Sequence, residues 1–190
     1  GRLEGLENFI WKDFLHTPVW VLNDAHAALM AEAAFGAGKD HKNIIMLTLG
    51  TGVGGGVMIN GELHQGLLSR AGHFGHVMVN ADSHLRDVTN MPGSLEDAIG
   101  DCTVEQRSFG KFSSTYDLLQ AYKKGDTLAT YIWLQSVKKL AISLSAFINI
   151  VSPDIIILGG GIAHAGKDLF EPLAAFMDIF EWHHSGVRTP

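Results

Sequence analysis

The chain of 190 residues has a single cysteine, Cys102, which excludes an intrachain disulfide and suits a reducing cytoplasm. It has no cluster of lysine and arginine and its net charge is −6, so a nucleic-acid-binding surface is not expected. We find no apolar run long enough to span a bilayer and no signal-peptide pattern at the start. Internal repeats and low-complexity segments are also lacking. These absences indicate a cytoplasmic globular protein with no membrane or nucleic-acid partner through this chain.

The composition is that of a folded domain. Hydrophobic residues make up 46% and charged residues 18% of the chain, which is typical of globular proteins. The length suffices for one compact domain with a core, or for one lobe of a larger molecule. The chain begins without an initiator methionine and stops at residues 187–190 without a closing helix, so we expect a piece of something longer.

Strands and helices are expected to alternate along the sequence. Residues 44–49 and 155–158 are uniformly apolar, as in strands that are buried on both faces. Residues 126–151 carry apolar side chains at helical spacing. The other expected elements are a helical turn around 9–15, a buried strand over 18–22, a helix over 25–37, a strand ending at 57–59, a strand-like segment at 77–79, a short helix after 94, and helices over 114–123 and 169–180. This order predicts a single α/β domain over residues 1–190, with a mixed sheet flanked by helices.

A glycine-rich loop follows the first apolar strand, in the stretch from Leu47 to Gly56. Glycines let a backbone approach a ligand closely, and successive N–H groups in such a turn can form a concavity that suits phosphate. The hydroxyl of Thr51 adds a donor. Asn60-Gly61 follows and is typical of a type I′ turn, so a tight β-hairpin without a ligand is the structural alternative.

Asp24 stands where the expected strand over 18–22 meets the next helix. A carboxylate at that point is stabilised by the helix dipole and can face a cleft beyond the strand ends. Aspartate is also a favoured capping residue, so a plain N-cap is the alternative.

His73 and His76 lie three positions apart in a loop that contains Gly72 and Gly75. They can contact a polar ligand or a metal, or they can simply bond the loop backbone. A zinc site needs further ligands at suitable spacing. The next segment offers His84 and Asp87 but no cysteine, so no zinc or other metal ligand set is expected.

Two later features have similar alternatives. Glu96 falls in the first turn of the helix after Ser94, where it can bind a ligand or only complement the helix dipole. The triple glycine at 159–161 follows a buried strand. It can let a nucleotide lie against bare backbone, or it can be a short connection to the next helix.

The order of these motifs resembles the ROK family of bacterial sugar kinases and related repressors. Five segments carry the resemblance, and together they cover nearly the whole chain. They are a sugar-binding and catalytic motif at 21–25, a phosphate motif at 47–56, an ExGH-type sugar motif at 71–76, the end of a zinc motif at 93–96 and an adenosine motif at 156–162.

The resemblance implies the C-terminal lobe of an actin-like (RNase H-like) ATPase fold, with ATP and Mg²⁺ as cofactors and a homodimer as the assembly. It makes Asp24 the general base that takes a proton from a sugar hydroxyl. It also implies that sugar hydroxyls are held by Asn23, His76 and Glu96, with help from His73. The nucleotide would be held at its phosphates by Gly50, Thr51, Gly52 and Gly54, and at its adenosine by Gly159, Gly160 and Gly161.

The chain departs from the family pattern in three ways. The zinc-binding cysteines are missing and Ser94 stands at the last of them, so the loop over 81–93 must be held without zinc or be mobile. His73 replaces the usual glutamate of ExGH, as it does in some family members, including N-acetylmannosamine kinases. The N-terminal lobe with its Asp-Gly-Gly-Thr motif is absent, so we expect little or no kinase activity from this chain alone.

Three functions are therefore compared. The first is an ATP-dependent kinase of a hexose or N-acetylhexosamine. The second is the sugar-sensing lobe of a repressor, and the third is a degenerate, non-catalytic sugar-binding protein. Retention of Asp24 and both glycine motifs favours the kinase, because a sensor has less need of a base and a nucleotide site. A Rossmann dehydrogenase is excluded, since no GxGxxG occurs at a strand-to-helix turn with an acidic residue after the next strand.

Overall fold

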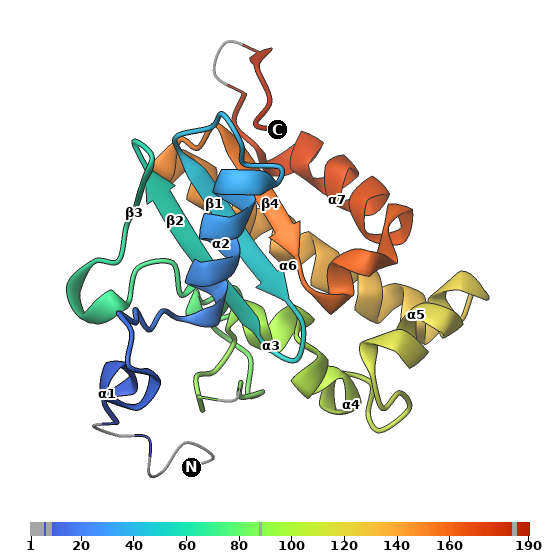
Figure 1. The fold of residues 1–190 in the computed structure, drawn as a ribbon. Helices are drawn as coiled ribbons and strands as arrows, with labels where there is room; N and C mark the ends of the chain where they lie inside the picture. The colour runs from blue at the N-terminus through green and yellow to red at the C-terminus, as the bar shows by residue number, and fades with distance from the viewer. Residues whose placement is uncertain (1–5, 7–8, 88, 184–185) are drawn as a thin grey trace.

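A mixed four-stranded sheet organises the computed structural model, which describes residues 6, 9–87, 89–183 and 186–190 (Figure 1). The strand order is β3-β2-β1-β4. The strands span Ile44–Leu49 (β1), Val53–Ile59 (β2), Glu62–Leu63 (β3) and Ile155–Gly159 (β4). Strand β1 pairs antiparallel with β2 and parallel with β4, which confirms the predicted mixed sheet.

The sheet is covered on both faces, and β1 shows how the sequence achieves this. Ile44 and Met46 pack with Leu29 of α2 (Asp24–Phe35) on one face. The alternate residues of β1, including Ile45 and Leu47, join the larger core cluster with α6 (Thr127–Val151) on the other. Figure 1 shows α2 in front of the sheet and α6 behind it. Because both faces are buried, β1 is apolar at every position except Thr48 rather than alternating.

The remaining helices agree with the expected segments, with shifts of a few residues at their ends, except for a short helix at Val104–Arg107 that the sequence did not predict. Ser94 caps the short helix after it, because its Oγ accepts a hydrogen bond from the amide of Asp97 over 3.1 Å. Asp126 caps α6 in the same way, through the amide of Ala129 at 2.9 Å. The other helices are α1 (Trp11–Leu15), α3 (Leu95–Ile99), α4 (Val104–Arg107), α5 (Thr115–Lys123) and α7 (Lys167–Phe180), with 3₁₀ turns at Leu67–Ser69, Phe74–His76, Asp101–Thr103 and Gly161–Ala165.

Helix α6 is long and apolar enough to cross a membrane by length and composition alone, so the prediction that the chain has no such run is wrong. Its apolar side chains have another use here. Trp133, Val137 and Leu140 are buried in the larger core cluster, and the indole Nε1 of Trp133 donates to the carbonyl of Asp168 over 2.8 Å. The helix is therefore the central support of one sheet face.

Two predicted strands are wrong. Residues 18–22 form no strand, and Trp20 and Val21 are 81% and 72% exposed. Aromatic and β-branched residues favour a strand only where a neighbour accepts the backbone hydrogen bonds, and no described strand pairs with this segment. Residues 77–79 likewise contribute only an isolated bridge, between Met78 and Ser94.

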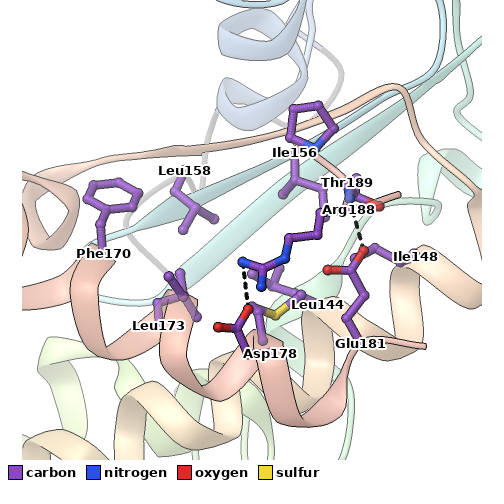
Figure 2. A pocket seen from close by; sticks show the side chains of 13 residues that line it. Leu144, Ile148, Ile156, Leu158, Phe170, Leu173, Asp178, Glu181, Arg188 and Thr189 are labelled. Atoms are coloured by element: carbon purple, nitrogen blue, oxygen red, sulfur yellow. Dashed lines mark hydrogen bonds and ion pairs between the residues drawn. The ribbon is translucent and has the colours of Figure 1, made fainter. Parts of the chain in front are cut away.

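An apolar hollow of about 270 Å³ lies between α6, α7, β4 and the C-terminal segment (Figure 2). Two polar contacts hold this segment to α7 and the residue that follows it. Arg188 Nη1 lies 2.7 Å from Asp178 Oδ1, and the amide of Thr189 donates to Glu181 Oε1 over 2.9 Å. None of the predicted site residues lines this hollow, so we look for the site elsewhere.

Candidate functional site

Two neighbouring cavities lie at the carboxyl end of β1, and Gly50 and Thr51 line both. The first has a volume of about 420 Å³. It is lined by Asp24, Thr48, Leu49, Gly50, Thr51, Gly52, Val53, Gly54, His73, His76, Glu96 and Gly160. The second has a volume of about 550 Å³. It is lined by Gly50, Thr51, Asp101, Thr115, Tyr116, Leu119, Gln120, Lys123, Gly161, Ile162, His164 and Ala165.

The structure therefore brings together most of the residues predicted from the sequence. Asp24, His73, His76 and Glu96 share the first cavity with the glycines of the 50–54 loop. Gly161 lines only the second cavity, whereas Gly160 lines the first. Asn23 and Gly159 line neither.

The N-terminus of α2 places Asp24 at the first cavity. The side chain of Asn23 is the true N-cap, since its Oδ1 accepts from the amides of Ala25 at 3.0 Å and His26 at 3.3 Å. Asp24 is the first helical residue, and its Oδ1 also accepts from the amide of Ala25, over 2.8 Å. The capping alternative thus applies to Asn23 rather than to Asp24, which is left exposed at the cavity wall.

The loop over 50–52 is anchored by its carbonyl groups. The carbonyl of Gly50 accepts from the amide of Asp101, and that of Thr51 accepts from the amide of Cys102, each over 2.9 Å. Among the described residues, the amides of Thr51 and Gly52 have no acceptor. Two adjacent unpartnered N–H groups, of which that of Thr51 belongs to a residue that lines both cavities, suit an anion. The predicted hairpin is confirmed, because β2 and β3 pair antiparallel on either side of Asn60-Gly61. The glycine-rich stretch that precedes it also joins an antiparallel pair, β1 and β2.

Glu96 ties α3 to the same loop. Its side chain is buried and its Oε2 accepts from the amide of Val53 over 2.8 Å. A Cβ atom at Gly52 would clash with this carboxylate, so a larger residue there would displace Glu96 from its present position. The glutamate therefore does more than complement the helix dipole, because it fixes the start of β2.

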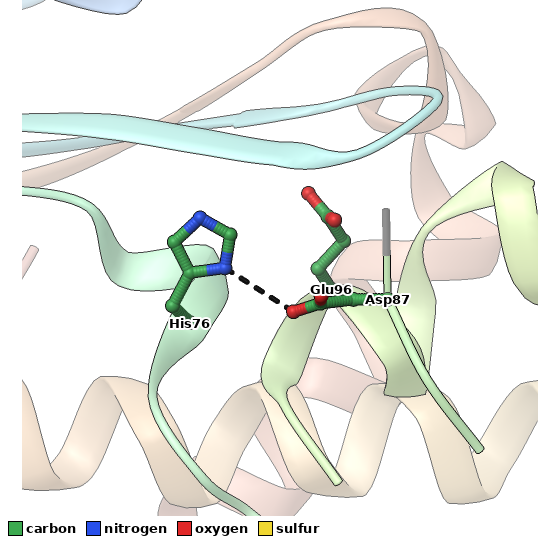
Figure 3. A group of neighbouring side chains, drawn as sticks. All are labelled: His76, Asp87 and Glu96. Carbon is green, nitrogen blue, oxygen red and sulfur yellow. Dashed lines mark hydrogen bonds and ion pairs between the residues drawn. The ribbon is translucent and has the colours of Figure 1, made fainter. Parts of the chain in front are cut away.

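His76 ends the 3₁₀ turn at 74–76, and its ring lies 6.2 Å from that of His73 between centroids. Its Nδ1 lies 3.2 Å from Oδ2 of Asp87 (Figure 3). Asp87 is buried and also accepts hydrogen bonds from the segment that follows it. The loop over 81–93, outside residue 88, is thus held by hydrogen bonds to this aspartate. Sequence reasoning had considered Asp87 only as a possible metal ligand beside His84.

His76, Asp87 and Glu96 bring one possible ligand atom each to within 4.8 Å of one another (Figure 3). Burial alone would raise the pKa of Asp87, but hydrogen bonds from Ser94, Thr89, Met91 and His76 outweigh it and lower that pKa to about 2. Asp87 is therefore ionised at neutral pH and its oxygens are already engaged by protein donors. Hydrogen bonds within the protein therefore hold Asp87 and His76 together.

The turn after β4 brings the second cavity against β1. Gly160 has a φ of +88°, and a Cβ there would lie 2.7 Å from the backbone nitrogen of Leu49. Only glycine allows this close approach. Sequence reasoning missed the far wall of this cavity, which includes Tyr116, Lys123 and His164. The first two come from α5, and no motif marks them, because tertiary packing brings them to the cavity.

Comparisons with known proteins show what the chain as a whole is similar to. The model of the ROK family matches residues 4–180. A glucokinase from Thermotoga maritima is 35% identical over 173 residues, which cover 82% of this chain and 54% of that protein. The chain thus spans little more than half the length of this curated relative.

Two solved structures have the same fold. The ROK hexokinase from Thermus thermophilus has a TM-score of 0.79 at 26% identity, covering 90% of this chain and 61% of that one. A ROK family glucokinase from Streptomyces griseus, in complex with glucose and AMPPNP, has a TM-score of 0.75 at 25% identity, covering 93% and 63%.

Proposed function

Because the chain belongs to the ROK family and has the actin-like ATPase fold of its kinases, we propose that it is the C-terminal, sugar- and nucleotide-binding lobe of an ATP-dependent sugar kinase. The substrate class is a hexose or an N-acetylhexosamine. One observation carries the proposal: the two cavities meet at Gly50 and Thr51. A phosphoryl group held at this junction would lie between its donor on one side and its acceptor on the other.

The first cavity suits a sugar. It combines the carboxylates of Asp24 and Glu96 with the imidazoles of His73 and His76. These groups offer acceptors to several hydroxyls at once, as a polyhydroxylated ligand requires. Asn23 does not line the cavity and its oxygen caps α2, so its contribution is to hold the helix end that presents Asp24.

Asp24 is the proposed general base. It lies at the cavity wall and is exposed, so an incoming hydroxyl can reach it. Removing a proton from the attacking hydroxyl by a positioned base typically contributes about 10²–10⁴-fold to a rate. Phosphoryl transfer otherwise depends mostly on positioning and charge neutralisation.

The second cavity suits a nucleotide. The free amide of Thr51, which lines it, and that of Gly52 next to it fit phosphate oxygens, and the bare backbone of Gly161 fits a flat ring and ribose. When bound, ATP would supply the phosphoryl group and Mg²⁺ would neutralise its charge. The chain's own part is to hold the phosphates at the junction and to orient the acceptor hydroxyl.

The test has a binding arm and a turnover arm. Binding of glucose, mannose, N-acetylglucosamine and N-acetylmannosamine to this chain is measured by NMR titration, and binding of AMPPNP by calorimetry. Sugar-dependent ATP consumption is measured on this chain and on a longer form that carries the complementary lobe. We expect turnover only in the longer form, and an Asp24→Ala variant should lose it by about a hundredfold or more while still binding sugar.

Two outcomes would count against the proposal. Clear turnover by the 190-residue chain alone would contradict its assignment as an incomplete lobe. Sugar binding without turnover in the longer form, and without nucleotide binding, would favour a sensor or repressor instead.

A further inference from the structure

Asp87 is a buried carboxylate at the edge of the proposed sugar cavity that has no role in the function described so far. The hydroxyl of Ser94 hydrogen-bonds this carboxylate. Its two oxygens otherwise have different partners. Oδ1 accepts three hydrogen bonds from the following segment, from the amide of Thr89 at 2.9 Å, its hydroxyl at 2.8 Å and the amide of Met91 at 2.9 Å. Oδ2 lies 3.2 Å from Nδ1 of His76. The loop therefore holds one oxygen, and the other faces the histidine.

The charge state of Asp87 decides the proton on His76. An ionised carboxylate can only accept hydrogen bonds, so Nδ1 of His76 must carry a proton to bond it. In the neutral imidazole, a proton on Nδ1 leaves Nε2 with a free lone pair. The hydrogen bonds that lower the pKa of Asp87 to about 2 keep it ionised at neutral pH.

The free nitrogen lies on the cavity side. Figure 3 shows Nε2 on the ring edge away from Asp87, and the carboxylate of Glu96 extends to the same side. His76 and Glu96 both line the first cavity with Asp24. Nε2 is thus directed toward the space where a ligand hydroxyl would bind.

We propose that Asp87 is a positioning residue: it fixes His76 in the Nδ1–H form, so that Nε2 accepts a hydrogen bond from a ligand hydroxyl. The ligand part of this inference rests on the proposed function, whereas the tautomer does not. The same carboxylate orders the loop at 87–91, so loop order and histidine orientation are linked through one side chain.

The structure predicts that the Asp87→Asn variant moves the proton of His76 from Nδ1 to Nε2. Its side-chain oxygen would have to face the three donors of Thr89 and Met91, since an NH₂ group cannot accept from them. The NH₂ group would then face His76 and donate to Nδ1. The neutral ring would have to switch its proton to Nε2.

The test is ¹⁵N NMR of the imidazole nitrogens in the 190-residue chain at about pH 9, well above the ordinary histidine pKa of about 6.5. A His76→Gln variant assigns the signals. We expect wild type to be protonated at Nδ1 and Asp87→Asn at Nε2. Asp82→Asn is the matched control, because Asp82 is exposed in the same loop, and it should leave the wild-type tautomer unchanged. Wild type protonated at Nε2, or no switch in folded Asp87→Asn, would overturn the proposal.

A second variant separates positioning from loop stability. Thr89→Ala removes one hydrogen bond to Oδ1 of Asp87 and a longer contact, of 3.5 Å, between the Thr89 hydroxyl and Nδ1 of His76. It leaves Oδ2 of Asp87 beside Nδ1, so it should weaken the loop but keep the Nδ1–H tautomer. In NMR titrations with glucose and N-acetylmannosamine, Asp87→Asn should weaken binding about tenfold and Thr89→Ala by much less. Equal losses in the two variants would indicate a structural role only. If no sugar binds to wild type while the tautomer switches as expected, the proposed function fails and the positioning role stands.

Discussion

The close approach of Gly160 to β1 predicts a large penalty for the smallest possible side chain. In Gly160→Ala, the new Cβ would lie 2.7 Å from the backbone nitrogen of Leu49 and closer still to its carbonyl oxygen. These are main-chain atoms of a buried strand, so they cannot move aside as a flexible side chain can. The φ of +88° adds about 1–2 kcal/mol for a residue with a Cβ, and the overlap adds about 1–3 kcal/mol. The expected loss of unfolding free energy is about 2–5 kcal/mol.

The adjacent glycine is the matched control. Gly161 has no atom within 4 Å of a built Cβ and no positive φ, so Gly161→Ala should stay within about 1 kcal/mol of wild type. Urea denaturation followed by circular dichroism measures both variants. In thermal melts, Gly160→Ala should lower Tm by about 5–15 °C, since 1 kcal/mol corresponds to about 2–4 °C at this size. Equal stability of the two variants would refute the close-packed turn and with it the wall shared by the two cavities.

Three further predictions concern the support of the site. Arg107→Met should destabilise the chain by about 2–3 kcal/mol in urea denaturation, because it removes hydrogen-bond donors to Thr103, Ser136 and Gly100. Burial lowers the pKa of Arg107 only to about 10, so the side chain stays charged and this loss should not vary between about pH 6 and 8. Leu29→Ala, on the opposite sheet face, should cost about 3–5 kcal/mol, and a loss below about 1 kcal/mol would contradict its full burial. The depressed pKa of Asp87 contributes stability that is present above its unfolded value of 3.8 and is lost as pH falls through about 2. The stability gap between wild type and Asp87→Asn should therefore shrink by about 2 kcal/mol between pH 5 and about 2, and a constant gap would exclude an ionised Asp87.

The fold could be predicted where the residues of a single segment determine its structure. The apolar run of β1, interrupted only by Thr48, indicates a strand buried on both faces, and the helical period of α6 indicates a core helix. The segment at 18–22 has equally strong strand composition, but β-propensity describes a side chain's fit to a sheet and cannot supply the neighbouring strand. The predicted strand over 18–22 is therefore wrong because no neighbouring strand pairs with it, which the composition of the segment cannot reveal.

The residues of the site also divide into those that could be predicted from the sequence and those that could not. Asp24, Glu96 and the glycines of the 50–54 loop were predicted because each stands in a recognisable motif at the end of a strand or the start of a helix. Tyr116 and Lys123 were not predicted, because they lie within α5 and reach the second cavity only through tertiary packing. Sequence reasoning also assigned Asp24 the capping alternative that the structure gives to Asn23, since the two residues are equally good caps and only backbone geometry separates them.

A single residue, Asp87, holds the loop over 81–93. A loop that is not held by a metal must either be mobile or bury polar groups that hydrogen-bond one another. Asp87 does the second by accepting hydrogen bonds from its own loop on Oδ1 and from His76 on Oδ2. Because one carboxylate serves both, we expect loss of that carboxylate to free the loop and release the histidine of the first cavity together. Loss of a single loop donor to Oδ1 leaves Oδ2 beside the histidine, so it should affect the loop alone.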